Sequence, residues 1–342
     1  MPKTVENRLH IDPERATQDI GNALRNQVGR VLRRSGLVVA MSGGIDSAVC
    51  AALAVQALGS RRVLGLALPE RASDQESLVL AARLARKLGI ELLVEDITPV
   101  LEGAGCYARR DKAIERLTPY GPGWRSKLVF EGGLGTDRLP LSFLMVGSPT
   151  GETSKIRVPA REFREIVAAT NFKQRVRTML AYFHADRLQY AVMGTPNRLE
   201  YELGFFVKGG DGLADVKPIA HVYKSQVYQL AQYLGIPAEI RARVPTTDTY
   251  SLPQTQEEFF FSLPLLELDL VLQAHDQGST PEETAADLGL TTVQVAHVFR
   301  DIERKRAATR YLHQQAMLVP SPEPQMRVLS PSPSGRGARK EE

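Results

Sequence analysis

The sequence has few of the residues on which several classes of protein depend. Only two of its 342 residues are cysteines, Cys50 and Cys106, which excludes a disulfide framework and a zinc site of four cysteines. Its six histidines have no spacing typical of a metal site. No apolar run approaches the ~20 residues that span a bilayer, and the polar start Met1–Thr4 does not resemble a signal peptide. We therefore expect a cytoplasmic protein without a membrane segment.

The overall composition is that of a globular protein with a slightly basic surface. Hydrophobic residues make up 43% of the chain and charged residues 24%, which is ordinary for such proteins. The formal net charge is +4. This balance suits either nucleic acid or a phosphate-rich small molecule and does not choose between them.

Strands and helices alternate between residues 37 and 96. Apolar strands are predicted at 37–41, 63–68 and 92–96, and helices follow the first two, the second at 73–88. Alternation of this kind predicts an α/β fold, a doubly wound parallel sheet covered by helices on both faces. Ligands of such sheets bind beyond the carboxyl ends of the strands.

The rest of the chain divides into an insertion, further helices and a tail. Residues 102–160 break the alternation and resemble an insertion, with a hairpin predicted around the turn 147–151. The region 1–318 is expected to form one domain, and 319–342 to be a disordered tail rich in Pro, Ser and charge. Other predicted elements are helices at 12–34, 162–184, 224–234, 281–288 and 292–311, and a strand at 188–193.

The most informative motif is the loop Ser42-Gly43-Gly44-Ile45-Asp46-Ser47, which follows the first strand and precedes an apolar helix. Adjacent glycines let the backbone approach a phosphate, and the first N–H groups of a helix attract anions. The serine hydroxyls can add donors, and Asp46 can hold a Mg²⁺ ion that phosphates also bind. No lysine follows the glycines, so this is not the phosphate loop of kinases and GTPases.

A second polar constellation lies between residues 194 and 224. It contains Glu200, Asp211 and Asp215, any of which could provide a further metal ligand beside the phosphate loop. Lys208 and Lys224 supply positive charge suited to phosphate. On composition alone, a solvated loop with turn glycines explains this segment equally well.

These motifs, taken in order, resemble a known family. The loop is similar to the SGGxDS loop of the ATP pyrophosphatases, and the segment from Gly194 to Lys224 looks like that of the NAD synthetase family. The similarity runs from about residue 36 to 305, excluding the insertion. The resemblance implies a nucleotide α-hydrolase fold with a helical C-terminal portion, and a homodimer. It also implies an ammonia-dependent ligase that adenylates the nicotinate carboxylate of deamido-NAD with ATP and aminates it, releasing NAD, AMP and pyrophosphate.

The resemblance also assigns site residues. Asp46 and Lys224 are the expected catalytic residues, because Mg²⁺ held by Asp46 and Glu200 would neutralise the departing pyrophosphate together with Lys224 and the N–H groups of the loop. Asp46 and Glu200 match the Mg²⁺ ligands of the family. The remaining matches are Ser42, Gly43, Gly44, Ser47, Thr195 and Thr246 with ATP, and Arg175, Lys208, Asp215 and Lys305 with deamido-NAD.

Two alternatives remain open at this point. An amide synthetase acting on another carboxylate is favoured by the insertion, by Arg304 in place of the histidine of the family, and by the unusual Pro196-Asn197-Arg198. A helix-turn-helix over 280–306, whose second helix is basic at its end, suggests DNA binding. We nevertheless expect free ammonia and deamido-NAD as substrates. A separate glutaminase would be an alternative source of the ammonia, and nucleic acid is not an expected partner.

Overall fold

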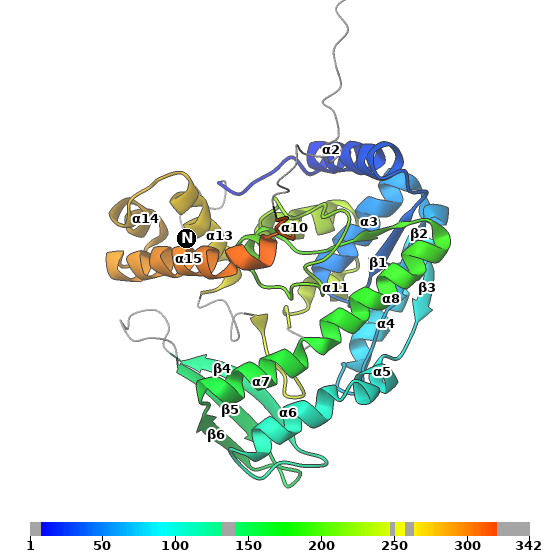
Figure 1. Ribbon diagram of the computed structural model, residues 1–342. Coiled ribbons are helices and arrows are strands. Elements are labelled where there is room, and N and C mark those ends of the chain that lie inside the picture. The colour runs from blue at the N-terminus through cyan, green and yellow to red at the C-terminus, as the bar shows by residue number, and fades with distance from the viewer. Residues whose placement is uncertain (1–7, 132–140, 247–249, 257–262, 320–342) are drawn as a thin grey trace, which may run out of the picture.

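A four-stranded parallel sheet organises the protein (Figure 1). The computed structural model describes residues 8–131, 141–246, 250–256 and 263–319. The strand order is β3-β2-β1-β7, and every neighbouring pair is parallel. This confirms the predicted α/β fold class. The strands are β1 (Leu37–Ala40), β2 (Val63–Ala67), β3 (Glu91–Val94) and β7 (Ala191–Met193).

Helices cover both faces of this sheet because successive side chains of a strand point to opposite faces. Leu37 and Val39 of β1 belong to one buried core, and Val38 between them belongs to another. The first core contains α2 (Pro13–Arg25), α3 (Ile45–Leu58), α4 (Gln75–Leu88), α10 (Lys224–Tyr233) and α11 (Ala238–Ala242). The second contains α5 (Thr98–Gly103), the start of α6 (Cys106–Glu115) and α8 (Phe172–Leu188).

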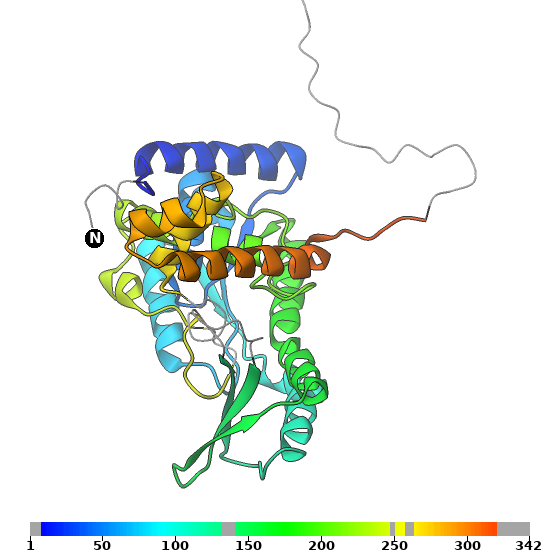
Figure 2. The ribbon, with the colours of Figure 1, turned by 90° about the vertical axis from the view of Figure 1, so that its left-hand side faces the viewer.

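The predicted insertion is a separate layer with its own small sheet. Strands β4 (Arg125–Glu131), β5 (Leu141–Gly147) and β6 (Thr153–Arg157) pair antiparallel in that order, against α6 and α7 (Ala160–Thr170). The hairpin expected around 147–151 is therefore confirmed, but β4 was not predicted. Figures 1 and 2 both show this sheet at the lower end of the molecule, away from α2.

The prediction of a single helix over 162–184 is wrong. Two helices, α7 and α8, meet at Asn171. The hydroxyl of Thr170 donates to the carbonyl of Ile166 four residues earlier, at 2.7 Å, and back-bonding of this kind bends helices. At the other end of the chain, the helix predicted over 12–34 is α2 followed by a short π-helical turn, η1 (Asn26–Val31).

The C-terminal portion is helical, as predicted. The helices α9 (Arg198–Leu203), α13 (Leu265–Asp276) and α15 (Thr292–His313) share a buried core, beside α14 (Pro281–Leu288). Capping boxes begin α14 at Thr280 and α15 at Thr291. No helix in the described part of the chain is long and apolar enough to cross a membrane. The predicted tail lies outside the described residues from 320 onward.

Candidate active site

The SGGxDS loop joins the carboxyl end of β1 to the first turn of α3. The Ser47 hydroxyl donates to the Gly44 carbonyl at 2.9 Å, and the Ser42 hydroxyl lies 3.2 Å from that of Ser47. Gly43 has a φ of +74°, and a Cβ at this position would lie 2.5 Å from the Ser77 carbonyl oxygen. Gly44 is the N-cap of α3 and brings no side chain to it. The first N–H groups of α3 are thus left for an anion.

Gly43→Ala is expected to disrupt this loop. The added methyl group meets the backbone of Ser77, so the change should lower the free energy of unfolding by about 2 kcal/mol or more and weaken ATP binding by about tenfold or more. Gly278→Ala is the matched control, because Gly278 has a φ of +77° and nothing within 4 Å of the new Cβ. Thermal unfolding and ATP titration of both variants measure the difference. Equal effects on ATP binding would contradict the role of the loop.

Asp46 lies in the first turn of α3 and has two partners from distant elements. The Asn197 amide donates to its Oδ1 at 3.1 Å, and the Lys224 ammonium pairs with its Oδ2. Asn197 is the N-cap of α9, and Lys224 is the first residue of α10. The predicted catalytic pair, Asp46 and Lys224, is therefore in direct contact.

Glu200 faces the same cluster and is only 9% exposed. The Asn197 N–H donates to its Oε2 at 3.2 Å, the second half of the capping box of α9, and Gln256 donates to its Oε1 at 3.0 Å. Burial, reinforced by the neighbouring Asp46 carboxylate, raises the pKa of Glu200 above its usual range. Burial and the like charge of Asp46 thus both disfavour the ionised form of Glu200.

A buried carboxylate on α13 places Lys224. The Asp269 carboxylate, which is fully buried, accepts hydrogen bonds from the backbone N–H groups of Lys224 at 3.3 Å and Ser225 at 2.7 Å. It thus caps the first turn of α10. Burial alone would lower the pKa of Lys224, but the carboxylates of Asp46 and Glu200 outweigh it and hold that pKa above its usual value. Lys224 is therefore a fixed positive charge.

The residues expected at deamido-NAD make mainly internal contacts. Arg175 donates to the carbonyl of Lys208 at 3.3 Å, and the Lys208 ammonium binds the Tyr311 carbonyl at 2.8 Å near the end of α15. Asp215 accepts from the backbone N–H of Val192 at 2.8 Å. Arg175 and Lys208 are thus brought together, whereas Asp215 supports the end of β7.

Three further predicted residues are less closely tied to the cluster. Lys305 pairs with Asp301 of its own helix at 2.8 Å. Thr195 is half-buried just beyond β7. Thr246 is exposed and forms an isolated bridge with Thr255. Their assignments stay predictions.

Three contributors to the cluster were missed: Asn197, Gln256 and Asp269. A signal existed for Asn197, because Asn followed three residues later by Glu is a capping-box pattern. The Asn197 side chain donates to Asp46 and accepts from the Glu200 N–H at 3.2 Å, so the unusual Pro196-Asn197-Arg198 contributes a residue to the cluster. Gln256 and Asp269 offered no signal, since their roles depend on where remote segments pack.

The cluster fits a divalent cation in its charge and its oxygen atoms. Mg²⁺ characteristically binds one or two protein carboxylates together with substrate phosphates and water. Asp46 and Glu200 provide two carboxylates, and the buried Oε1 of Gln256, next to Glu200, has no hydrogen-bond partner among the described residues. No larger group of His, Cys, Asp or Glu able to hold a metal occurs in those residues.

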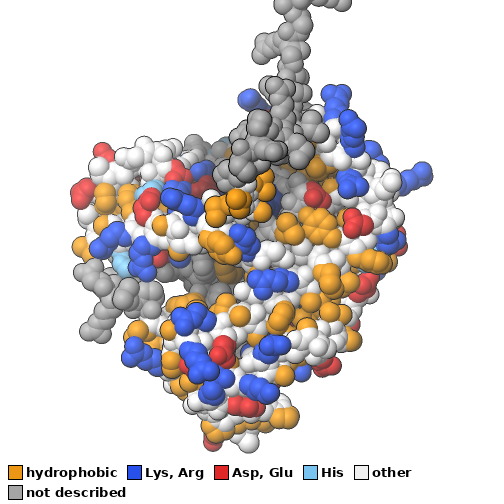
Figure 3. Space-filling view, in the orientation of Figure 1, with side chains coloured by type: hydrophobic (Ala, Val, Ile, Leu, Met, Phe, Trp, Pro, Cys, Tyr) orange, Lys and Arg blue, Asp and Glu red, His pale blue; other side chains and the backbone are white. Residues whose placement is uncertain are grey.

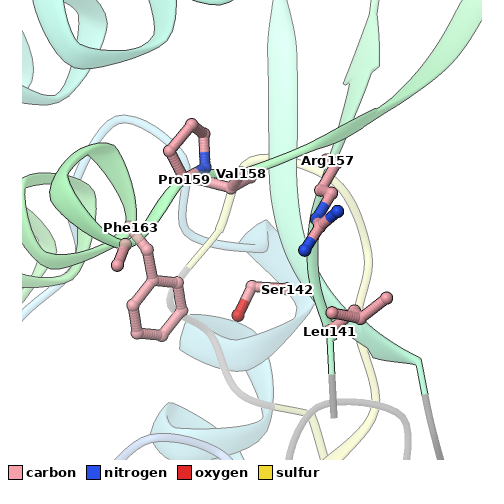
Figure 4. A pocket seen from close by; sticks show the side chains of 7 residues that line it. Leu141, Ser142, Arg157, Val158, Pro159 and Phe163 are labelled. Atoms are coloured by element: carbon pink, nitrogen blue, oxygen red, sulfur yellow. The ribbon is translucent and has the colours of Figure 1, made fainter. Parts of the chain in front are cut away.

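Other surface features lie away from this cluster. An open pocket of about 570 Å³ is lined by residues of β5, β6 and α7, among them Ser142, Arg157 and Phe163 (Figure 4). Figure 3 shows Lys and Arg side chains gathered over α6 and α7 at the lower end of this face. There, Arg116 pairs with Glu162 at 3.2 Å and with Glu165. Neither feature contains a predicted site residue.

The helix-turn-helix segment is part of the folded body. Val298 and Ile302 of α15 are buried in the C-terminal core. Of the basic residues considered for DNA, Arg306 pairs with Asp276 at 2.8 Å and with Glu202, and Lys305 pairs with Asp301. These pairs reduce the positive charge that this segment presents.

The protein has an α/β fold in which the SGGxDS loop joins β1 to α3 beside a buried carboxylate–lysine cluster. These features define a protein of the ATP pyrophosphatase type. A family model described as NAD synthase matches residues 16–116 and 151–311. The chain therefore belongs to the NAD synthase family, and the family predicted from its motifs is confirmed.

Relatives and solved structures agree with this assignment. The chain is 53% identical to the NH(3)-dependent NAD(+) synthetase of Rhizobium rhizogenes, over 91% of this chain and 94% of that protein. It is 54% identical to the protein of the same name from Rhizobium meliloti, over 91% and 93%. The fold matches that of NMN synthetase from Francisella tularensis with a TM-score of 0.62 at 22% identity, covering 91% of this chain and 99% of that one.

Proposed function

We propose that the protein is an ammonia-dependent NAD synthetase, a carbon–nitrogen ligase that converts deamido-NAD, ATP and ammonia into NAD, AMP and pyrophosphate. The observation that carries this proposal is the contact of Asp46 with Lys224 beside Glu200, at the mouth of the SGGxDS loop. Three segments far apart in the sequence converge there, which supports one site for phosphate and cation. The names of the rhizobial relatives supply the substrate.

The positive groups of the site suit a reaction whose barrier comes from the negative charge of the ATP phosphates. In the first half-reaction, a carboxylate oxygen of the substrate bonds to the α-phosphorus of ATP and pyrophosphate leaves. Lys224 and the N–H groups at the start of α3 would stabilise that leaving charge. Mg²⁺, held by Asp46 and Glu200, would supply further positive charge at the phosphates. In the second half-reaction, ammonia bonds to the acyl carbon, AMP leaves with the bonding electron pair, and the nitrogen loses a proton to solvent, so that no nucleophilic side chain is required.

Oligomeric state and location follow the same proposal. We propose a homodimer, as the family resemblance implies, and a location in the cytoplasm. On α8, Met179 and Phe183 lie one turn apart with 53% and 59% of each exposed. Large apolar side chains left in solvent on one helix face are typical of a surface that a second chain covers.

A product assay tests the activity. The protein is incubated with ATP, Mg²⁺, ammonium and deamido-NAD, and the products are measured by mass spectrometry. We expect NAD and AMP in equal amounts, both dependent on ammonium. Production of AMP without NAD would indicate that water, not ammonia, resolves the adenylate. Folded, ATP-binding protein that makes neither product would contradict the proposed substrate.

A second candidate is an amide synthetase for a smaller carboxylate. It is favoured by one observation, the fold match to an enzyme named for making NMN. The same assay with the carboxylate precursor of NMN in place of deamido-NAD distinguishes the two. We expect deamido-NAD to be the better substrate.

A further inference from the structure

The free edge of the inserted sheet holds a segment that reaches the active site. β4 is the outer strand of that sheet, and residues 250–254 run beside it. The Ser126 N–H donates to the Ser251 hydroxyl at 2.9 Å, and the Leu252 N–H donates to the Ser126 carbonyl at 3.3 Å. The Gln254 amide, 4% exposed, donates to the Leu128 carbonyl at 2.5 Å. One backbone and two side-chain hydrogen bonds thus hold this segment against β4.

Apolar packing also holds residues 250–254 against the inserted layer. Tyr250 packs against the core of the insertion, which includes the buried Leu128, Val146 and Ile166. These residues come from β4, β5 and α7. The segment is therefore anchored by a side chain inside the inserted layer as well as by hydrogen bonds at its edge.

The far end of the segment touches the catalytic cluster. Two residues after Gln254, the Gln256 amide donates to Glu200 Oε1 at 3.0 Å. The Gln256 N–H bonds to the Pro245 carbonyl at 3.0 Å, and Thr255 bridges to Thr246. Residues 250–256 are therefore held by β4 at one end, and at the other end the Gln256 side chain contacts Glu200, the predicted metal ligand.

We propose that the inserted sheet is a positioning element of the active site. By holding Gln254, β4 places Gln256 against Glu200 and fixes the neighbouring Thr246–Thr255 bridge. The match to the family model omits residues 117–150, which contain β4 and β5. This support is therefore an addition to the pattern that the family model describes. The kinetic part of the proposal rests on the proposed function, and its structural part does not.

Hydrogen exchange of the full-length protein tests the structural part. Gln254→Leu keeps the bulk of the side chain but cannot donate to Leu128. We expect the amides of 250–256 to exchange at least tenfold faster, while those of α3 stay protected. Gln273→Leu is the matched control, because the Gln273 amide also donates to a backbone carbonyl, that of Arg8 at 3.1 Å, away from the cluster. If Gln254→Leu does not fold, Ser251→Ala, which removes the acceptor for Ser126, takes its place.

Steady-state kinetics of the same proteins tests the consequence. We expect Gln254→Leu to lower kcat about tenfold with circular dichroism unchanged, and Gln273→Leu to stay within twofold of the wild type. Gln256→Leu should lower kcat similarly without faster exchange in 250–254, because β4 still holds that stretch. Unchanged exchange of 250–256 in Gln254→Leu would overturn the proposal. So would an equal loss of kcat in Gln273→Leu. A wild type that makes no NAD would instead refute the proposed function and leave the exchange result standing.

Discussion

Asp46→Asn is expected to reduce AMP formation by about 10³-fold, the order of loss seen when a preorganised electrostatic contact to a transition state is removed. The amide keeps the shape of the carboxylate but loses the charge that pairs with Lys224 and would hold the cation. Asn197 could still bond to the remaining oxygen, so the fold should persist. The measurement is the rate of AMP release with saturating ATP, deamido-NAD and ammonium.

An exposed carboxylate provides the control for this variant. Asp19→Asn removes the same charge from α2, where Asp19 makes only a long surface contact of 3.9 Å with Arg15. Its activity should stay within twofold of the wild type, since such pairs contribute little. Turnover by Asp46→Asn within tenfold of the wild type, in a protein that unfolds at the usual temperature, would refute the catalytic assignment.

Lys224→Met should cause the largest loss of stability as well as loss of activity. Lys224 is 1% exposed, and without it the half-buried carboxylate of Asp46 and the buried one of Glu200 lose the cation that pairs with them among the described residues. Removing one member of a buried charge group costs about 3–5 kcal/mol, because the other charges are left uncompensated. Thermal and urea unfolding measure the change. Added Mg²⁺ should restore part of the stability by binding the folded state alone.

The matched control for this variant is Lys87→Met on α4. Lys87 is exposed and bonds to the Gly235 carbonyl, so its replacement should change the free energy of unfolding by less than about 1 kcal/mol. If Lys224→Met were as stable as Lys87→Met, Asp46 and Glu200 would have to be neutral or solvated in the folded protein. The electrostatic account of the site would then fail.

Local patterns made the nucleotide half of the fold predictable. β1, the SGGxDS loop and α3 are consecutive in the sequence, and an apolar strand, two glycines and an apolar helix identify them without any distant contact. The capping boxes at Thr280 and Thr291 are equally local and were also confirmed. Elements of this kind can be predicted from the residues that form them.

Features that depend on distant packing were not predictable in the same way. β4 reads Arg-Ser-Lys-Leu-Val-Phe-Glu, and the charged residues near its ends interrupt the apolar pattern that predicts a strand. It is stabilised by β5 on one side and by residues 250–254 on the other. The residues alone left Glu200, Asp211 and Asp215 as alternatives beside the phosphate loop, and the family resemblance selected Glu200, since more than twenty residues separate even the closest pair among Asp46, Glu200 and Lys224. Gln256 and Asp269 were missed because their partners are set by tertiary structure alone.

The strand order has a consequence for the way the chain is synthesised. β1, β2 and β3 lie within residues 37–94 and can pair as soon as that stretch leaves the ribosome. The other edge of β1 stays unpaired until β7 has been synthesised, because Leu37 pairs with Ala191, which follows the whole inserted layer in the sequence. Until then the nascent chain exposes an unpaired apolar strand, which is a template for aggregation. The inserted β4–β6 layer lies before β7 in the sequence and lengthens that interval, so the insertion also affects how safely the protein reaches its native state.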